Sequence, residues 1–377
     1  MNRINKHRNI LDFTLSSLLR RKRKNTALVL VYILVVFGLA SVLFSTQALK
    51  REACSILQRS PEVVIQRLVA GRHELIPTSY IDKIKDVRGV QTVKRRLWGY
   101  YYDPTVGANY TLMVPDDPAV AEGTIVIGKG VARTLRAEKG DLLPFKANDG
   151  FFVSLEVGDI ISSDSELVSS DLVLMNEGDF RQITGVPAGY FTDMVLSVRN
   201  VKELPTIAEK IRRLAPDTRP IVKDDILRTY ETIFDWRGGI LLVILAGAIM
   251  AFIIFAWDKA SGLSSEERKE IGILKGIGWE TSDVILMKFW EGTVISLSSF
   301  LLGCVFAYIH IFYASSALFE PVLKGWAVLY PKFRLIPYID PLQLATLFFL
   351  TVIPYTVATI IPSWRAATVD PDSVMRL

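Results

Sequence analysis

The sequence lacks most of the residue patterns on which enzyme and metal sites are built. Cysteine occurs only as Cys54 and Cys304, which supply neither a disulfide framework nor a metal-ligand spacing. The three histidines are scattered, and no HExxH, CxxC or GxSxG pattern is present. A GxxxxGK[ST] phosphate loop is also missing, so the chain is not expected to bind ATP in the usual way. We therefore predict a protein that is not an enzyme and has no cofactor or metal ion of its own.

Charged residues are scarce as well. They make up 22% of the 377 residues, whereas half of the chain is hydrophobic, which is too apolar for a soluble protein of this size. The net charge of +5 is modest and sits largely near the N-terminus. Such a distribution indicates membrane orientation and argues against nucleic acid as a partner.

Four apolar runs are long enough to cross a bilayer as helices. They cover residues 26–49, 237–258, 289–312 and 342–364. The first follows the basic run Arg20–Lys24, so the positive-inside rule places the N-terminus in the cytoplasm. A cleaved signal peptide is disfavoured, because the run is too long and no small-residue cleavage site follows it. Alternation then makes 1–25, 259–288 and 365–377 cytoplasmic and puts 50–236 and 313–341 outside.

The fold class predicted from this pattern is a membrane α-helical protein with four transmembrane helices and a mixed α+β extracytoplasmic domain inserted between spans 1 and 2. Just before the first span, Leu11, Leu15 and Leu18 fall on one helical face. This face suits a helix in the inner-leaflet interface, with the following basic residues turned towards anionic headgroups, so membrane lipid is an expected partner. The alternative is a frayed start of the first span.

The outer block alternates predicted strands and helices. Strands are expected over 61–69, 89–102, 123–128, 151–161, 171–175 and 193–199, and helices over 79–87, 130–136 and 201–214. The pieces near 61–102 and 193–222 are interpreted as two halves of one sheet, split by a β-rich insert at about 123–180. Helical patterns over 47–59 and 224–234 continue the adjacent spans outward and predict a two-helix stalk.

A short charged helix is predicted between the second and third spans, over residues 264–278. Ser264 and Glu267 have capping-box spacing, and Gly276 and Gly278 are expected to end the helix. A loop that only joined two spans would need no such helix. Glu291, one turn into the third span, is the candidate intramembrane ionisable residue. It either pairs with Lys288 or reaches the headgroups, or it has a structural or coupling role.

Three motifs resemble those of the FtsX-like permeases of the ABC superfamily, MacB/LolC type. Residues 267–278 (ERKEIGILKGIG) are similar to the coupling-helix pattern of that family, and Glu291 matches a glutamate that often follows it. The tail 362–376, with Arg365, Asp370 and Pro371, resembles the closing motif of the family. In the outer block, 126–132 followed by Gly140 and Asp141 is similar to the MacB-like periplasmic core domain.

The resemblance implies a multi-pass permease subunit of the mechanotransmission class in the bacterial inner (cytoplasmic) membrane. Its implied partners are a separate cytosolic ABC ATPase dimer, which would bind the ATP, and a second permease subunit, identical or different. A periplasmic or outer-membrane partner is left open. The side chains that would contact the ATPase are Glu267, Arg268, Glu270, Ile271, Leu274 and Lys275.

Two functions follow from this resemblance. The leading hypothesis is export or extraction of a hydrophobic, lipoprotein, peptide or drug substrate, driven by the ATPase. The alternative is a non-transporting signalling subunit that activates a cell-wall hydrolase or a sensor kinase. The size of the outer block favours transport, because signalling members of the cell-division type usually have a smaller one. A stand-alone receptor without an ATPase would leave the 264–278 helix unexplained.

Overall fold

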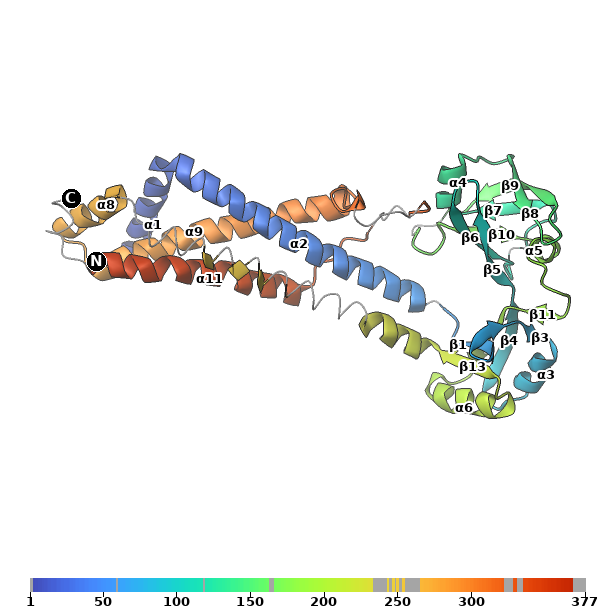
Figure 1. Ribbon diagram of the computed structural model, residues 1–377. Helices are drawn as coiled ribbons and strands as arrows, with labels where there is room; N and C mark the ends of the chain where they lie inside the picture. Colours follow the sequence, from blue (N-terminus) through green and yellow to red (C-terminus); the bar gives the residue numbers. More distant parts are fainter. Residues whose placement is uncertain are drawn as a thin grey trace. The chain divides into compact units, whose positions relative to one another are not determined.

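A computed structural model describes residues 3–58, 60–117, 119–162, 166–232, 243, 246–247, 249–250, 253–254, 265–321, 328–330 and 335–368. The chain forms two compact units. The first comprises residues 1–49, 234–316 and 336–377, and the second comprises 50–233 and 317–335. Figure 1 shows the helices and strands of both units, and each unit has hydrophobic clusters of its own.

The first unit is helical. Its elements are α1 (Arg3–Arg20), α2 (Lys22–Gln58) as far as Leu49, α8 (Ser265–Gly276), α9 (Thr281–Tyr308) with a π-helical extension η2 (Ile309–Tyr313), and α11 (Pro341–Ala367). Three helical stretches among the described residues are long and apolar enough to cross a membrane, namely Asn25–Gln58, Thr281–Tyr313 and Pro341–Ile360. They correspond to the first, third and fourth predicted spans. Most of the second, 237–258, lies outside the described residues.

Small residues let these helices approach closely, as is common where helices pack within a membrane. A Cβ placed on Gly303 of α9 would lie 2.7 Å from a methyl group of Val36 in α2. On the same helix, a Cβ on Gly292 would lie 2.6 Å from the Thr359 hydroxyl of α11. The Tyr32 hydroxyl also donates a 2.7 Å hydrogen bond to the Thr351 carbonyl. α2, α9 and α11 thus form one bundle, in which α2 crosses α9 in the view of Figure 1.

One part of the second unit is an antiparallel sheet in the order β13-β1-β12-β4, with β2 pairing β1. These strands are β1 (Val63–Val69), β2 (Arg72–Glu74), β4 (Val90–Arg96), β12 (Asp193–Val198) and β13 (Thr218–Val222). The helices α3 (Ser79–Lys85) and α6 (Leu204–Leu214), the latter preceded by η1 (Val201–Glu203), pack their apolar residues on it. The prediction that 61–102 and 193–222 contribute two halves of one sheet is confirmed for β1, β2 and β4 of the first half and for β12 and β13 of the second, but not for residues 98–102.

The other part is a six-stranded sheet in the order β5-β6-β10-β7-β9-β8. Its strands are β5 (Trp98–Asp103), β6 (Ala108–Met113), β7 (Thr124–Ile127), β8 (Leu142–Lys146), β9 (Phe152–Ile160) and β10 (Leu172–Met175). The helices α4 (Lys129–Leu135) and α5 (Glu177–Thr184) share its core. The Tyr101 hydroxyl of β5 accepts a hydrogen bond from the Lys146 amide of β8, so the two ends of the sheet meet.

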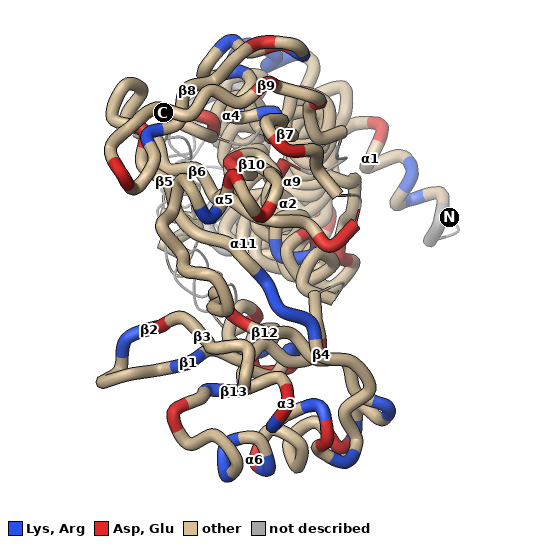
Figure 2. The backbone as a smooth tube through the Cα atoms, turned by 90° about the vertical axis from the view of Figure 1, so that its right-hand side faces the viewer, with Lys and Arg blue, Asp and Glu red and all other residues tan. Residues whose placement is uncertain are grey.

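The strand predicted over 89–102 was wrong as a single element. The chain changes sheet at Leu97, so that β4 and β5 belong to different sheets. The return crossing runs from β11 (Tyr190–Phe191), which pairs β3 (Ile76–Pro77), into β12. β4 ends in three consecutive basic residues, which colour it blue in Figure 2. A continuous run of strand-forming residues gives no sign of such a change, because both halves have the same period of two.

A segment from between α9 and α11 completes the six-stranded part. Residues 317–335 belong to the second unit, and Leu329 packs against its core. Arg133 of α4 donates to both carboxylate oxygens of Glu166, at 3.0 and 2.7 Å, and to the Tyr330 carbonyl at 3.2 Å. The segments around Arg133 and Leu329 lie nearly 200 residues apart in the sequence. They nevertheless belong to one part of the fold and share one hydrophobic core.

Candidate functional site

The candidate site is α8 together with α1 and the first turns of α9. α8 ends in a Schellman motif, in which the Trp279 amide donates to the Leu274 carbonyl and the Gly278 amide to the Lys275 carbonyl, both at 3.0 Å. Gly278 adopts a φ of +101°, which only glycine takes without strain, whereas Gly276 is the last helical residue. The predicted end of the helix is thus confirmed. The predicted capping residue Ser264 lies outside the described residues.

One face of α8 is buried within this chain. Ile271 and Leu274 are each 5% exposed. Leu274 packs with Ile10 of α1 and Met287 of α9, and the rings of Phe13 and Trp279 lie 5.3 Å apart beside them. Burying aliphatic side chains of this size stabilises the cluster by about 1.5–3 kcal/mol each. α8 is therefore fixed on α1 and α9 by apolar contacts.

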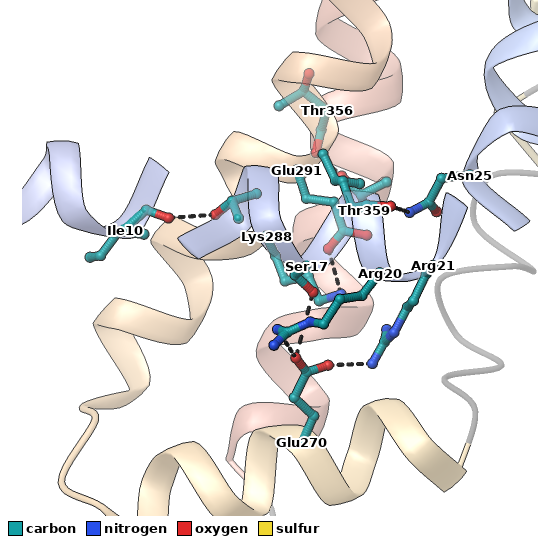
Figure 3. Close-up of polar contacts among 12 residues, drawn as sticks. Ile10, Ser17, Arg20, Arg21, Asn25, Glu270, Lys288, Glu291, Thr356 and Thr359 are labelled. Atoms are coloured by element: carbon teal, nitrogen blue, oxygen red, sulfur yellow. Dashed lines mark hydrogen bonds and ion pairs between the residues drawn. The ribbon is translucent and has the colours of Figure 1, made fainter. Parts of the chain in front are cut away.

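An ion-pair cluster also joins α8 to the C-terminal end of α1. The Glu270 carboxylate accepts from the Arg21 guanidinium, from Arg20 at 3.4 Å and from the Ser17 hydroxyl at 3.5 Å (Figure 3). The Arg20 guanidinium also lies 5.6 Å from the centroid of the Phe13 ring. The Arg20 side chain is 62% exposed, so its ion pair contributes no more than about 1 kcal/mol. The apolar packing therefore supplies most of the energy that holds α8 in place, and the ion pairs fix its orientation.

A second polar contact joins α1 to the start of α9. Glu280 and Asp283 form a reciprocal capping box at the beginning of α9. The Lys6 ammonium lies 2.6 Å from the Asp283 carboxylate, and the hydrogen bond to that carboxylate raises the pKa of Lys6 above its ordinary value. α1 therefore touches both helices that flank the turn at Gly278.

Glu291 has a partner on its own helix. The Lys288 ammonium lies 2.6 Å from the Glu291 carboxylate, with the two side chains 9% and 26% exposed. Pairing with Lys288 was one of the alternatives that the sequence left open, and the structure shows that pair. A neutralised pair can lie near the end of a membrane helix at far lower cost than an isolated carboxylate.

Most of the remaining predicted site residues fall outside the part of the chain whose side chains the structure describes. Glu267 and Arg268 belong to the α8 backbone, but their side chains lie outside the described part, as does the side chain of Arg365 in α11. Asp370 and Pro371 also lie outside the described residues. Lys275 is partly buried. The structure thus brings Glu270, Ile271 and Leu274 into contacts within the chain.

Sequence reasoning missed the outward face of α8. Lys269 is exposed, and Ile273 and Ile277 are 52% and 71% exposed. The i, i+4 spacing places Lys269 and Ile273 on one side of α8, away from Ile271 and Leu274, and Ile277 follows directly after the last helical residue. The sequence contains a sign of this face in Ile273 and Ile277, which lie four residues apart. The pattern alone does not say whether α1 covers this pair or the pair Ile271 and Leu274.

The junction between the two sheets of the second unit is a further polar cluster that the sequence did not reveal. Asp193, 1% exposed at its side chain, accepts from Arg96 at 2.7 and 2.6 Å and from the Trp98 indole at 2.9 Å. The Thr192 hydroxyl donates to the Trp98 carbonyl at 2.7 Å. These bonds tie the two crossing segments, 96–98 and 191–193, to each other.

Within the described ranges, no group of three or more His, Cys, Asp or Glu side chains is arranged to hold a metal ion. The arrangement around α8 instead presents a rigidly supported helix with an apolar, basic outer face. Its geometry suits a contact surface.

The fold and this surface define a helical membrane protein with an inserted α+β domain. Residues 238–371 match the family model described as FtsX-like permease C-terminal. FtsX-like permeases are membrane subunits of ABC transporters. No curated protein matches the chain.

Two solved structures show a similarity at 11% identity. One is the extracellular domain of the noncanonical ABC-type transporter YknZ from Gram-positive bacteria, with a TM-score of 0.30, covering 43% of this chain and all of the other. The second is the periplasmic region of MacB from Actinobacillus actinomycetemcomitans, with a TM-score of 0.32, covering 45% of this chain and 92% of the other.

Proposed function

We propose that this chain is the transmembrane subunit of a mechanotransmission ABC transporter, and that α8 receives the work of a separate cytosolic ATPase. The family match over 238–371, which includes the whole of α8, carries this proposal. In this arrangement both termini and α8 are cytoplasmic, and the second unit lies outside the membrane. The transported substrate is a hydrophobic molecule, lipoprotein, peptide or drug, and a second permease subunit completes the complex.

The contacts of α8 support its proposed role as the helix that receives force from the ATPase. A helix that transmits force must be held on its inner side and open on its outer side. Ile271 and Leu274 hold it, while Lys269, Ile273 and Ile277 are open. We therefore assign the docking contact to the open stripe, together with whichever of the predicted Glu267 and Arg268 share it. Glu270 and Leu274 position the helix rather than dock the ATPase.

The test is co-purification of the full-length chain with its ATPase, identified by ATP hydrolysis. Ile273→Glu and Ile277→Glu each place a charge in the proposed apolar contact, and the double variant should lose the ATPase, because two buried charges without partners are costly. Leu214→Glu is the matched control, since Leu214 is 53% exposed but lies on α6 of the second unit. Retention of a fully active ATPase by the double variant would contradict the docking surface.

Transport and signalling are separated by a second measurement. Reconstituted complex should extract or move a substrate from proteoliposomes only in the presence of hydrolysable ATP. A complex that hydrolyses ATP but moves no lipid, lipoprotein or hydrophobic peptide, and instead activates an external hydrolase, would support the signalling function.

A further inference from the structure

The basic residues at the junction of α1 and α2 occupy a distinctive place. Arg20 ends α1, Arg21 follows it, and Lys22 and Arg23 begin α2 shortly before Asn25, the first residue of a candidate membrane span. A helix rises 1.5 Å per residue, so these side chains lie within a few ångströms of the hydrocarbon edge, at the depth of lipid headgroups. Lys22 and Arg23 are exposed. The cluster is thus both basic and accessible where phosphates are concentrated.

Two members of this cluster are at the same time the partners of α8. Arg20 and Arg21 donate to the Glu270 carboxylate (Figure 3). A guanidinium binds a phosphate in the same forked geometry as a carboxylate, so a phosphate and Glu270 compete for the same donors. The attraction of one basic residue to an anionic leaflet is of the same order as a partly exposed ion pair. Glu270 and a lipid phosphate therefore bind the two arginines with comparable strength, and the lipid composition can shift the equilibrium between the two bound states.

We propose that Arg20–Arg23 form a binding site for the phosphate group of anionic phospholipids, and that a bound headgroup displaces Glu270 from Arg20 and Arg21 and loosens α8 from α1. The exposed leucines of α1 fit such a surface. Leu15 and Leu19, four residues apart, are 40% and 73% exposed on the side away from Leu274, and can enter the interface once the helix is drawn to it. The consequence for ATPase coupling, though not the binding itself, rests on the proposed function.

The test measures the α1–α8 distance in nanodiscs by pulsed electron paramagnetic resonance. Spin labels are placed on Ser16→Cys and Ile273→Cys, both exposed, after Cys54→Ser and Cys304→Ser. In phosphatidylcholine alone we expect one narrow distance, and added phosphatidylglycerol should lengthen and broaden it. Glu270→Gln should show the broad distribution already in phosphatidylcholine. The double variant Arg20→Gln, Arg21→Gln should not respond to phosphatidylglycerol, whereas Arg8→Gln, an exposed control on α1, should respond as the parent does.

A second readout is the affinity for the lipid itself. Because competition is reciprocal, Glu270→Gln should bind fluorescent phosphatidylglycerol several-fold more tightly than the parent. Inorganic phosphate at matched ionic strength distinguishes a soluble anion from a lipid. A full response to phosphate alone would overturn the lipid assignment, and so would identical distances in the two membranes. Neither readout contains an ATPase, so their failure and the failure of the proposed function are independent results.

Discussion

Glu270 of α8 is hydrogen-bonded to Arg21, a residue 249 positions away, at the point where α1 gives way to α2. This contact connects the helix proposed to receive force with the first membrane span. The apolar cluster of Ile10, Leu274 and Met287 reinforces it on the same side of α8. In this arrangement α8 is supported by two separate parts of the chain, its own flanking helix α9 and the N-terminal α1.

Reversing the charge of Glu270 should weaken this support. Glu270→Arg replaces an attraction by a repulsion, and we expect amide hydrogen exchange in α8 to accelerate about tenfold, the equivalent of ~1.4 kcal/mol. Combining it with Arg21→Glu should recover most of the protection. Asp12→Arg, which changes an exposed acid elsewhere on α1, is the control and should leave α8 unchanged. Equal exchange in the single and double variants would show that the pair contributes nothing.

Removing Arg133 should release the segment around Tyr330. Arg133→Ala deletes two hydrogen bonds to Glu166 and one to the Tyr330 carbonyl, and leaves Glu166, 12% exposed at its side chain, without this partner. We expect a loss of about 2 kcal/mol, read as faster hydrogen exchange over 328–330 in the full-length chain. Arg136→Ala, also exposed and just after the same helix, should not change exchange there. Unchanged exchange in both variants would mean that Leu329 alone holds the segment.

Asp193→Ala should be the most damaging of these substitutions. It leaves the Arg96 guanidinium, 27% exposed, and the Trp98 indole without their acceptor at the junction of the two sheets. We expect a loss of about 2–3 kcal/mol in the free energy of unfolding. This is at or below the lower end of the loss typical of breaking a fully buried ion pair, because the Arg96 side chain is partly exposed to solvent. Asp116→Ala, which breaks an exposed 3.0 Å pair with Lys94, is the control and should cost less than ~1 kcal/mol. Equal losses in thermal unfolding experiments would contradict a special role for the junction.

Acid should destabilise the second unit partly through Asp217. The hydrogen bond from the Tyr80 hydroxyl, at 2.7 Å, and that from Arg67, at 2.9 Å, lower the pKa of Asp217 below its ordinary value. The folded state therefore releases this proton more readily than the unfolded chain does. The resulting stability is complete above the unfolded pKa, near ~4, and is lost as the pH falls through the lower folded pKa.

Asp217→Asn should remove that part of the pH dependence. Urea unfolding of the full-length chain at a series of pH values below ~5 should give a flatter curve for the variant than for the parent. Asp82→Asn, on the exposed side of α3, is the control and should leave the curve unchanged. A parent and variant with parallel curves would exclude Asp217 as a contributor.

Several elements could be predicted because their causes are local. Apolar length alone indicated the helices that became α2, α9 and α11, and alternation with turn residues indicated most strands of the second unit. The terminus of α8 followed from Gly278, since positive φ favours glycine wherever it occurs. The halves of the β13-β1-β12-β4 sheet were recognisable because each carries its own strand–helix pattern.

Other features depend on residues far apart in the sequence. Isoleucine and leucine recur along α8, but only tertiary packing decided that Ile271 and Leu274 are buried, the latter against Ile10 and Met287, while Ile273 and Ile277 stay exposed. The break between β4 and β5 and the docking of Leu329 likewise arise from partners that are distant along the chain.

By itself the sequence determined three helices long and apolar enough to cross a membrane, an inserted α+β domain and a short helix that ends at a glycine turn. Hydrophobic length and backbone propensity act over a few neighbouring residues and can be read there. Only the tertiary structure decided which face of α8 is open and which acid the arginines before the first span engage. Burial and ion pairing are properties of residues brought together by folding, and no local pattern specifies them.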